Sequence, residues 1–198
     1  MSCSSILALM GSPMPGGNTD ILIDTLITHA QKQGATTVTL RLYSMNFRGC
    51  IECGGCDKTG ICILQDDFTP VYERLLEADY VVAASPMFFY NISSAMQAAV
   101  ERSQALWMAK YRLNGIIKRQ KPGQGVFIGV GATKGKLLFE GAQRVMKYFF
   151  DAIDLRFAGS LLYRGIDAKG EIKGHETAMN DVTRLAEAMA RGEVLNLT

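Results

Sequence analysis

Two patterns of apolar residues alternate along this chain. Short, mostly apolar runs are typical of strands buried in a parallel sheet, and five of them occur, over residues 4–10, 36–42, 80–85, 124–131 and 155–163. Stretches with apolar positions three or four residues apart predict helices, over residues 20–33, 68–77, 93–107, 135–150 and 176–191. The chain is therefore expected to repeat a strand–helix unit five times.

This alternation predicts an α/β fold, a doubly wound parallel sheet with helices on both faces. The right-handed crossover rule leaves few ways to connect it. The length of 198 residues fits one domain. No linker or repeat divides the chain, so we expect a single domain over 1–198. Ligands of such sheets bind beyond the carboxyl ends of the strands, and three loops leave such ends, 11–19, 86–92 and 131–135.

The composition narrows the class of protein. Hydrophobic residues make up 48% of the chain and charged residues 20%, which suits a globular core. A net charge of +2 is too small to favour nucleic acid or a membrane surface as partner. No apolar run approaches the roughly 18 residues of a membrane-spanning helix, and the first residues lack the basic start of a signal peptide. We therefore expect a cytoplasmic protein.

The first of the three loops, Gly11–Thr19, has the composition of an anion site. A helix that begins after it offers unpaired amides and a positive dipole end. Ser12, Asn18 and Thr19 add neutral donors, and Asn18 or Thr19 can also cap the helix. A Walker A loop would need a lysine here, and the G-x-G-x-x-G fingerprint is absent. The remaining interpretation is a loop that binds a monophosphate through amides and hydroxyls. The alternative is an ordinary Gly/Pro turn that binds no ligand.

The other two loops suggest a flat aromatic ligand. Residues 85–93 place several large apolar side chains directly after the third strand, where aromatic groups suit a planar partner. Small residues around Gly131 close the fourth strand, as the close approach of a ligand requires. The alternative is that these aromatic side chains pack against the core or against a neighbouring subunit.

Three segments carry a family resemblance. GSPMPGGNT, SPMFFYNISSAMQAAVERSQALW and GVGATKGK, in this order and spacing, resemble the NADPH-dependent FMN reductase group of flavodoxin-like proteins over nearly the whole chain. The resemblance implies a flavodoxin-like sheet of order 2-1-3-4-5 and FMN as cofactor. Many members carry a basic residue after Gly-Ser-Pro, whereas this chain has Met14, which brings no charge to the phosphate.

The resemblance also implies which residues hold FMN. The first loop would bind the phosphate, and the loop after the third strand would lie against the isoalloxazine. The predicted cofactor-binding residues are therefore Ser12, Pro13, Asn18, Thr19, Pro86, Met87, Phe88, Phe89, Asn91 and Gly131.

A cysteine-rich connection at about residues 46–67 follows the second strand. Its four cysteines are spaced x2, x2 and x5, a density at which four thiolates can ligate one [4Fe-4S] cluster, and they are Cys50, Cys53, Cys56 and Cys62. The motif resembles the compact cysteine motif of iron–sulfur flavoproteins, a branch of the same family. Zinc is one alternative, although structural zinc usually uses two separated cysteine pairs. Disulfides or free thiols are another.

These features predict an FMN-dependent oxidoreductase or electron-transfer flavoprotein with a [4Fe-4S] cluster. It would pass electrons from NAD(P)H or ferredoxin to a small-molecule acceptor. Because the flavin itself carries the electrons, no catalytic acid or base is named. The alternatives are a cluster-free NAD(P)H-dependent FMN, quinone or azo-compound reductase, a flavodoxin-type carrier without enzymatic activity, and a redox or metal sensor. The resemblance favours a homodimer or homotetramer, with Trp107 and Met108 as contact residues.

Two charged groups are interpreted as structural. Asp66 and Asp67 are expected to cap the helix that begins near Phe68 and to favour its dipole. The basic run over 118–121 precedes a proline and is expected to be a solvated loop.

Overall fold

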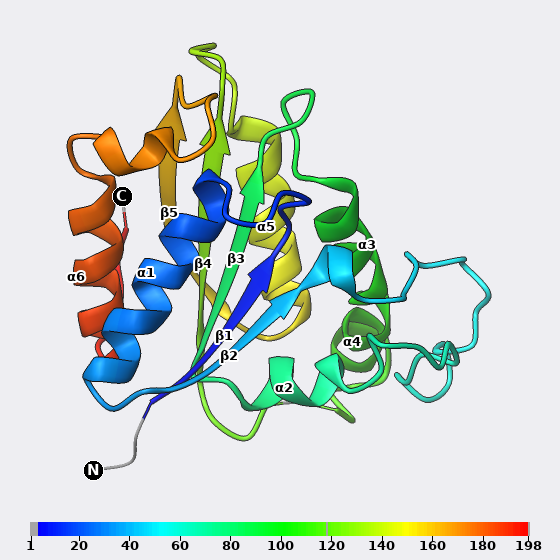
Figure 1. The fold of residues 1–198 in the computed structure, drawn as a ribbon. Helices are drawn as coiled ribbons and strands as arrows, with labels where there is room; N and C mark the ends of the chain where they lie inside the picture. The colour runs from blue at the N-terminus through cyan, green and yellow to red at the C-terminus, as the bar shows by residue number, and fades with distance from the viewer. Residues whose placement is uncertain (1–3, 118, 198) are drawn as a thin grey trace.

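Five parallel strands form the centre of the molecule. The computed structural model describes residues 4–117 and 119–197. The strands are β1 (Ser5–Met10), β2 (Thr36–Arg41), β3 (Tyr80–Pro86), β4 (Gln124–Gly131) and β5 (Arg156–Arg164). They pair in parallel in the order β2-β1-β3-β4-β5 (Figure 1). The predicted fold and strand order are therefore confirmed.

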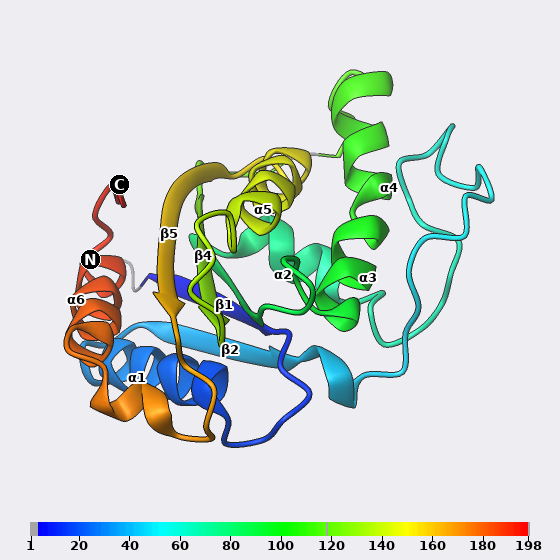
Figure 2. The same cartoon turned by 90° about the horizontal axis from the view of Figure 1, so that it is seen from above.

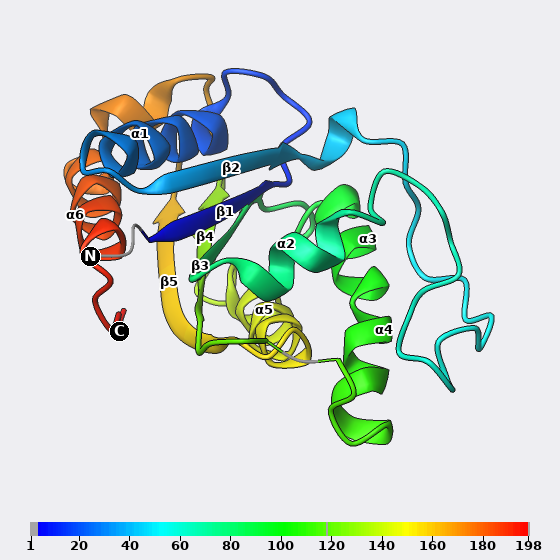
Figure 3. The same ribbon diagram turned by 90° about the horizontal axis from the view of Figure 1, so that it is seen from below.

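Helices cover both faces of this sheet. One face carries α1 (Asn18–Lys32) and α6 (Ala178–Ala190), and the other carries α2 (Val71–Glu77), α3 (Ser94–Arg102), α4 (Gln104–Trp107) and α5 (Glu140–Ala152) (Figures 2 and 3). The short helical turns are η1 (Leu42–Ser44), η2 (Met108–Arg112) and η3 (Glu171–Gly174). Within the described residues, no helix is long and apolar enough to cross a membrane.

Strand β1 shows why both faces are apolar. Successive side chains of a strand point to opposite faces. Ile6, Ala8 and Met10 accordingly pack in the core beneath α1 and α6, whereas Leu7 and Leu9 pack in the core on the other face. A central strand with two buried faces therefore needs a continuous apolar run rather than alternation.

Two predicted helices begin or end differently in the structure. Helix α1 begins at Asn18 after the N-cap residue Gly17, which makes no side-chain cap, so the prediction that Asn18 or Thr19 caps it is wrong. The helix predicted over 93–107 is interrupted at Ser103, whose hydroxyl donates to the Ala99 carbonyl at 3.2 Å. Such back-bonding bends helices, and helical backbone continues afterwards through α4 and η2.

The aspartates before α2 do not cap this helix, and Asp67 instead joins the two ends of the cysteine-rich segment. Helix α2 begins only at Val71, and its N-cap residue is Pro70. Asp67 accepts a hydrogen bond from the Asn46 amide at 2.6 Å and donates its own amide to the Asn46 carbonyl. Phe47 stacks on Phe68 beside them, with ring centroids 5.1 Å apart. The two ends of the segment are therefore joined at one point.

The basic run before β4 is only partly solvated, because Arg119 is buried while residues 120 and 121 are exposed. Arg119 is only 7% exposed, and its guanidinium donates to the carbonyls of Leu75 and Ala78 at the end of α2. These are carbonyls that a helix end leaves without partners. Burial lowers the pKa of Arg119. Lys121 pairs with Asp79 at 2.6 Å, and Lys118 lies outside the described residues.

Candidate functional site

The three predicted loops meet at one edge of the sheet. The Gly11 amide, after β1, donates to the Ala84 carbonyl of β3 at 2.8 Å. The Met87 amide, after β3, donates to the Val130 carbonyl of β4 at 2.8 Å. Because β1, β3 and β4 are neighbours, their carboxyl ends bring together loops that are far apart in the sequence (Figure 1).

The first loop presents free backbone amides to this edge. The Ser12 hydroxyl accepts from the Met14 amide at 3.2 Å, which makes a tight turn, and Pro13 is exposed beside it. In the described part of the chain, the backbone amides at residues 18–20 donate to no acceptor. Thr19 is buried among them. Unpaired amides at the beginning of a helix form a site suited to an anion.

A buried carboxylate fixes the back of this loop. Asp20 is fully buried, and its Oδ2 accepts the Gly16 amide at 2.8 Å and pairs with the Arg41 guanidinium at the end of β2. This hydrogen bond with Asp20 raises the pKa of Arg41. The predicted site residues did not include Asp20, although an acidic residue within the first turn of a helix was the available signal.

Asn18 joins the first loop to a fourth segment that sequence reasoning did not include. Its Nδ2 donates to the Ala168 carbonyl at 2.9 Å, and its Oδ1 accepts from the Ile172 amide at 3.2 Å. The side chain predicted to donate to a phosphate therefore also holds the turn that follows β5. These partners are 150 and 154 residues away in the sequence.

A strained aromatic turn follows β3. Phe88 and Asn91 form a two-way backbone bridge, and the residues between them, Phe89 and Tyr90, have φ angles of 49° and 63°. Large side chains rarely adopt this left-handed backbone, which costs about 1–3 kcal/mol for each residue. Phe89 is 104% exposed and Phe88 and Tyr90 are about half exposed. Strained backbone is often found at ligand-binding segments, so strain and exposed rings together make this turn a candidate functional surface.

The remaining predicted residues pack tightly around that turn. Pro86 ends β3 and Met87 follows it, both partly buried. Gly131 is buried at the end of β4, where an added Cβ would lie 2.7 Å from Leu138 Cδ2 and 3.4 Å from Met87 Cβ. A larger residue at Gly131 would therefore force the Leu138 side chain to move.

The cysteine-rich segment extends beyond α3 and α4, away from the sheet (Figures 2 and 3). Its four cysteines have free thiols and line one cavity of about 520 Å³, closed on the helix side by Glu101, Gln104 and Ala105. Burial raises the pKa of the Cys56 thiol, and Asp57 and neighbouring cysteines add to this.

The donors in this cavity suit a [4Fe-4S] cluster in kind and number. The residues that the structure describes contain no group of three or more His, Cys, Asp or Glu side chains arranged to hold a metal ion. That finding concerns a site for a single ion. In a cubane cluster each cysteine ligates a different iron, so the four sulfurs do not converge on one point.

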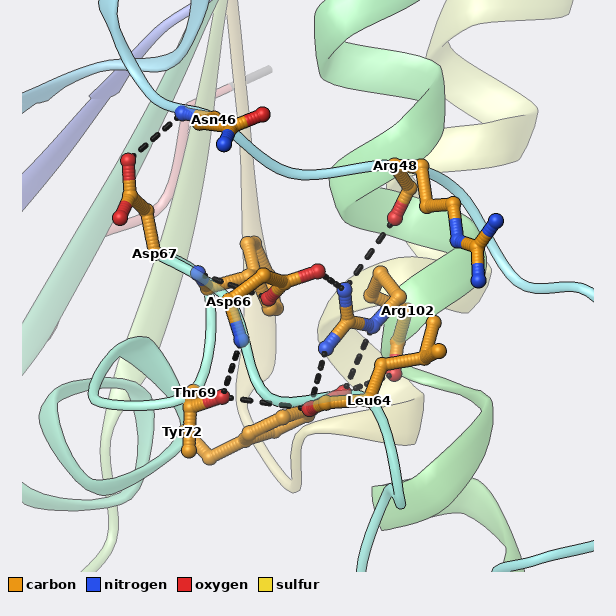
Figure 4. Close-up of polar contacts among 9 residues, drawn as sticks. Asn46, Arg48, Leu64, Asp66, Asp67, Thr69, Tyr72 and Arg102 are labelled. Carbon is orange, nitrogen blue, oxygen red and sulfur yellow. Dashed lines mark hydrogen bonds and ion pairs between the residues drawn. The ribbon is translucent and has the colours of Figure 1, made fainter.

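A buried arginine of α3 holds both arms of the cysteine-rich segment (Figure 4). The side chain of Arg102 is fully buried, and its Nη1 donates to the Arg48 carbonyl at 3.2 Å and pairs with Asp66 at 2.5 Å. Nη2 donates to the Leu64 carbonyl at 3.4 Å, and Nε donates to the Tyr72 hydroxyl at 3.3 Å. One guanidinium therefore connects α3 to the residues on either side of the four cysteines.

The charge of Arg102 is retained despite its burial. Desolvation alone would lower the pKa of the guanidinium, but hydrogen bonds with Asp66 and Tyr72 outweigh it and the pKa is raised. Burial raises the pKa of the Tyr72 hydroxyl. The predicted site residues did not include Arg102. Its only signal in the sequence is a basic residue at a helix position where the spacing of the apolar residues would place a buried side chain.

A profile of the family described as NADPH-dependent FMN reductase matches residues 4–156. The chain belongs to this family. The resemblance predicted from the sequence is thereby confirmed. The matched region contains the three loops and the cysteine-rich segment, whereas the turn after β5 and helix α6 lie beyond it.

Relatives within the family include iron–sulfur flavoproteins. One from Methanocaldococcus jannaschii is 28% identical over 131 residues, which are 66% of this chain and 65% of that protein. Another from Methanosarcina thermophila is 26% identical and covers 66% of each chain. The chain thus aligns with slightly less than two thirds of their length. A Bacillus subtilis protein, YwqN, named as an NAD(P)H-dependent FMN-containing oxidoreductase, is 24% identical and covers 91% of this chain and 95% of its own length.

Solved structures share the fold. The NAD(P)H:quinone oxidoreductase from Methanothermobacter marburgensis superposes with a TM-score of 0.69 at 14% identity, covering 95% of this chain and 98% of that one. At this identity the likeness supports the flavodoxin-like fold alone.

Proposed function

We propose that this chain is an FMN-dependent oxidoreductase that passes electrons from NAD(P)H or ferredoxin to a small-molecule acceptor. The observation that carries the proposal is the unpaired amides at residues 18–20, which lie at the same sheet edge as the exposed aromatic turn. FMN supplies hydride or single-electron transfer when it is bound. The residues of this chain bind and orient it.

In this proposal the phosphate and the isoalloxazine ring of FMN contact different loops. The amides at 18–20, with Ser12 and Thr19 beside them, bind the phosphate at the beginning of α1. The turn at 86–92 lies against the isoalloxazine, where Phe88 and Phe89 contribute apolar surface. The hydrogen bond from the Met87 amide to the Val130 carbonyl keeps this turn close to the end of β4.

We further propose that Cys50, Cys53, Cys56 and Cys62 hold a [4Fe-4S] cluster. The support is their common cavity, the thiol donor set and the names of the iron–sulfur relatives. Helix α3 begins beside the aromatic turn and ends at Arg102, next to the cavity. The same helix therefore contacts both proposed sites.

The first test is the flavin content and turnover of anaerobically purified protein. We expect FMN after extraction, and oxidation of NADPH, NADH or reduced ferredoxin with a quinone or ferricyanide as acceptor. Protein that contains no flavin and cannot be reconstituted with FMN would contradict the proposal. Stable cycling without turnover would favour a carrier instead of an enzyme.

The second test concerns the cysteines. We expect iron and acid-labile sulfide in the wild-type protein, and we expect Cys53→Ala to remove both while FMN remains bound. Iron near zero in the anaerobic wild-type protein would favour the cluster-free reductase. Loss of FMN together with iron in the variant would mean that the segment supports the flavin site.

Sedimentation of the same samples tests the predicted dimer or tetramer.

A further inference from the structure

The first loop contains no basic side chain, yet a lysine from another segment lies over it. Lys169 belongs to the turn between β5 and η3. A Cβ placed on Gly16 would lie 3.6 Å from Lys169 Cε and 3.7 Å from Lys169 Nζ. Among the residues that the structure describes, Lys169 forms no ion pair. We propose that Lys169 supplies the positive charge that binds the FMN phosphate.

The turn that carries Lys169 is held on both sides. Glu171 Oε2 accepts the amides of Asp167 at 2.7 Å and Ala168 at 2.9 Å. The Asn18 side chain bridges the Ala168 carbonyl and the Ile172 amide. Lys169 thus lies between two residues that are both tied to the first residue of α1. The backbone that carries the ammonium is therefore fixed relative to the amides at 18–20.

The chemistry of the phosphate explains why a cation is needed here. A phosphate monoester carries a charge of about −1.5 to −2 at pH 7. The beginning of a helix offers the equivalent of roughly half a positive charge. The nearby carboxylate of Asp20 is already paired with Arg41, so this ion pair adds little net charge. An ammonium is a compact point charge with three donors, and Lys169 would balance most of the remainder.

The inference rests on the proposed function and concerns the choice between FMN and riboflavin. Riboflavin has the same ring system but lacks the phosphate, so it would gain nothing from Lys169. The residue lies outside the matched region 4–156. Selectivity for the phosphorylated flavin would therefore come partly from a segment that the family profile does not include.

The test compares the Kd values of FMN and riboflavin for flavin-free protein, by fluorescence quenching. We expect K169Q to weaken FMN by about tenfold, the loss expected for one charge-assisted hydrogen bond at an exposed site. Riboflavin binding should not change, which also shows that the variant is folded. K173Q is the matched control, because Lys173 is an exposed lysine in neighbouring η3. Adding M14K to the K169Q variant should restore the affinity for FMN and leave the affinity for riboflavin unchanged.

The outcomes separate the two proposals. If the wild-type protein binds FMN and riboflavin equally, or neither, then the phosphate site itself is wrong and Lys169 has no such role. If the wild-type protein prefers FMN and K169Q keeps the same preference, then the role of Lys169 is overturned while the proposed function stands. Equal weakening of FMN by K169Q and K173Q would also overturn it, because the effect would then be one of general surface charge.

Discussion

The first loop and the cysteine-rich segment are built in different ways. The first loop is part of the sheet edge, and its proposed ligand-binding groups are backbone amides that the beginning of α1 leaves free. The cysteine-rich segment lies outside the sheet, its ligand-binding groups are side chains, and one buried arginine holds it to α3. The first site thus follows from the fold, whereas the second depends on particular long-range side-chain contacts.

The largest effect should come from removing the arginine. We expect Arg102→Met to lower the free energy of unfolding by about 3–5 kcal/mol, because Asp66 is left without its cation. The thiols of iron-free protein should then react faster with a disulfide reagent. Urea denaturation and thiol-labelling rates measure the two effects.

The control for that variant is Arg102→Lys, which keeps the charge but not the forked guanidinium. It should recover only part of the stability, since one ammonium cannot reach Asp66 and the carbonyls of Arg48 and Leu64 together. If Arg102→Met left both unfolding and labelling unchanged, the segment would be held by other contacts.

A smaller effect is expected at Asn18. Asn18→Ala removes two hydrogen bonds to the turn after β5 and should cost about 1–2 kcal/mol of stability. It should also reduce the preference for FMN over riboflavin, because the turn that carries Lys169 is released. Thiol-labelling rates should stay at the wild-type value. A change in labelling would show that the two regions are coupled, and an additive double variant with Arg102→Met would show that they are independent.

The smallest effect, and one of opposite sign, is expected at the aromatic turn. Phe89→Gly places a residue that tolerates positive φ at a strained position and should stabilise the protein by about 1 kcal/mol. Phe89→Ala removes the same ring but keeps the strained backbone. If the ring contacts flavin, both variants should bind FMN more weakly, and only the glycine variant should unfold at higher urea. Equal unfolding midpoints would mean that the turn stores no strain.

The sequence predicted the sheet and the location of the three loops because these depend on strong local patterns. Continuous apolar runs marked the buried strands, and the parallel order then placed the loops at one edge. The sequence did not predict the partners of Arg102, Arg119 or Asn18. A long or polar side chain carries no local sign of which distant carbonyl or carboxylate it will meet. Asp66 illustrates this, since its position before a helix suggested a cap while its main partner is 36 residues away.

The closed neck at Asn46 and Asp67 has a consequence for how this protein can be altered. The two residues bond to each other directly, with the stacked rings of Phe47 and Phe68 beside them. The Arg102 contacts with Arg48 and Leu64 lie just inside this junction. The part whose length and sequence should vary without moving β2 or α2 is therefore the stretch between Arg48 and Leu64, which carries the four cysteines. A different redox centre should be introduced there, with both sets of contacts kept.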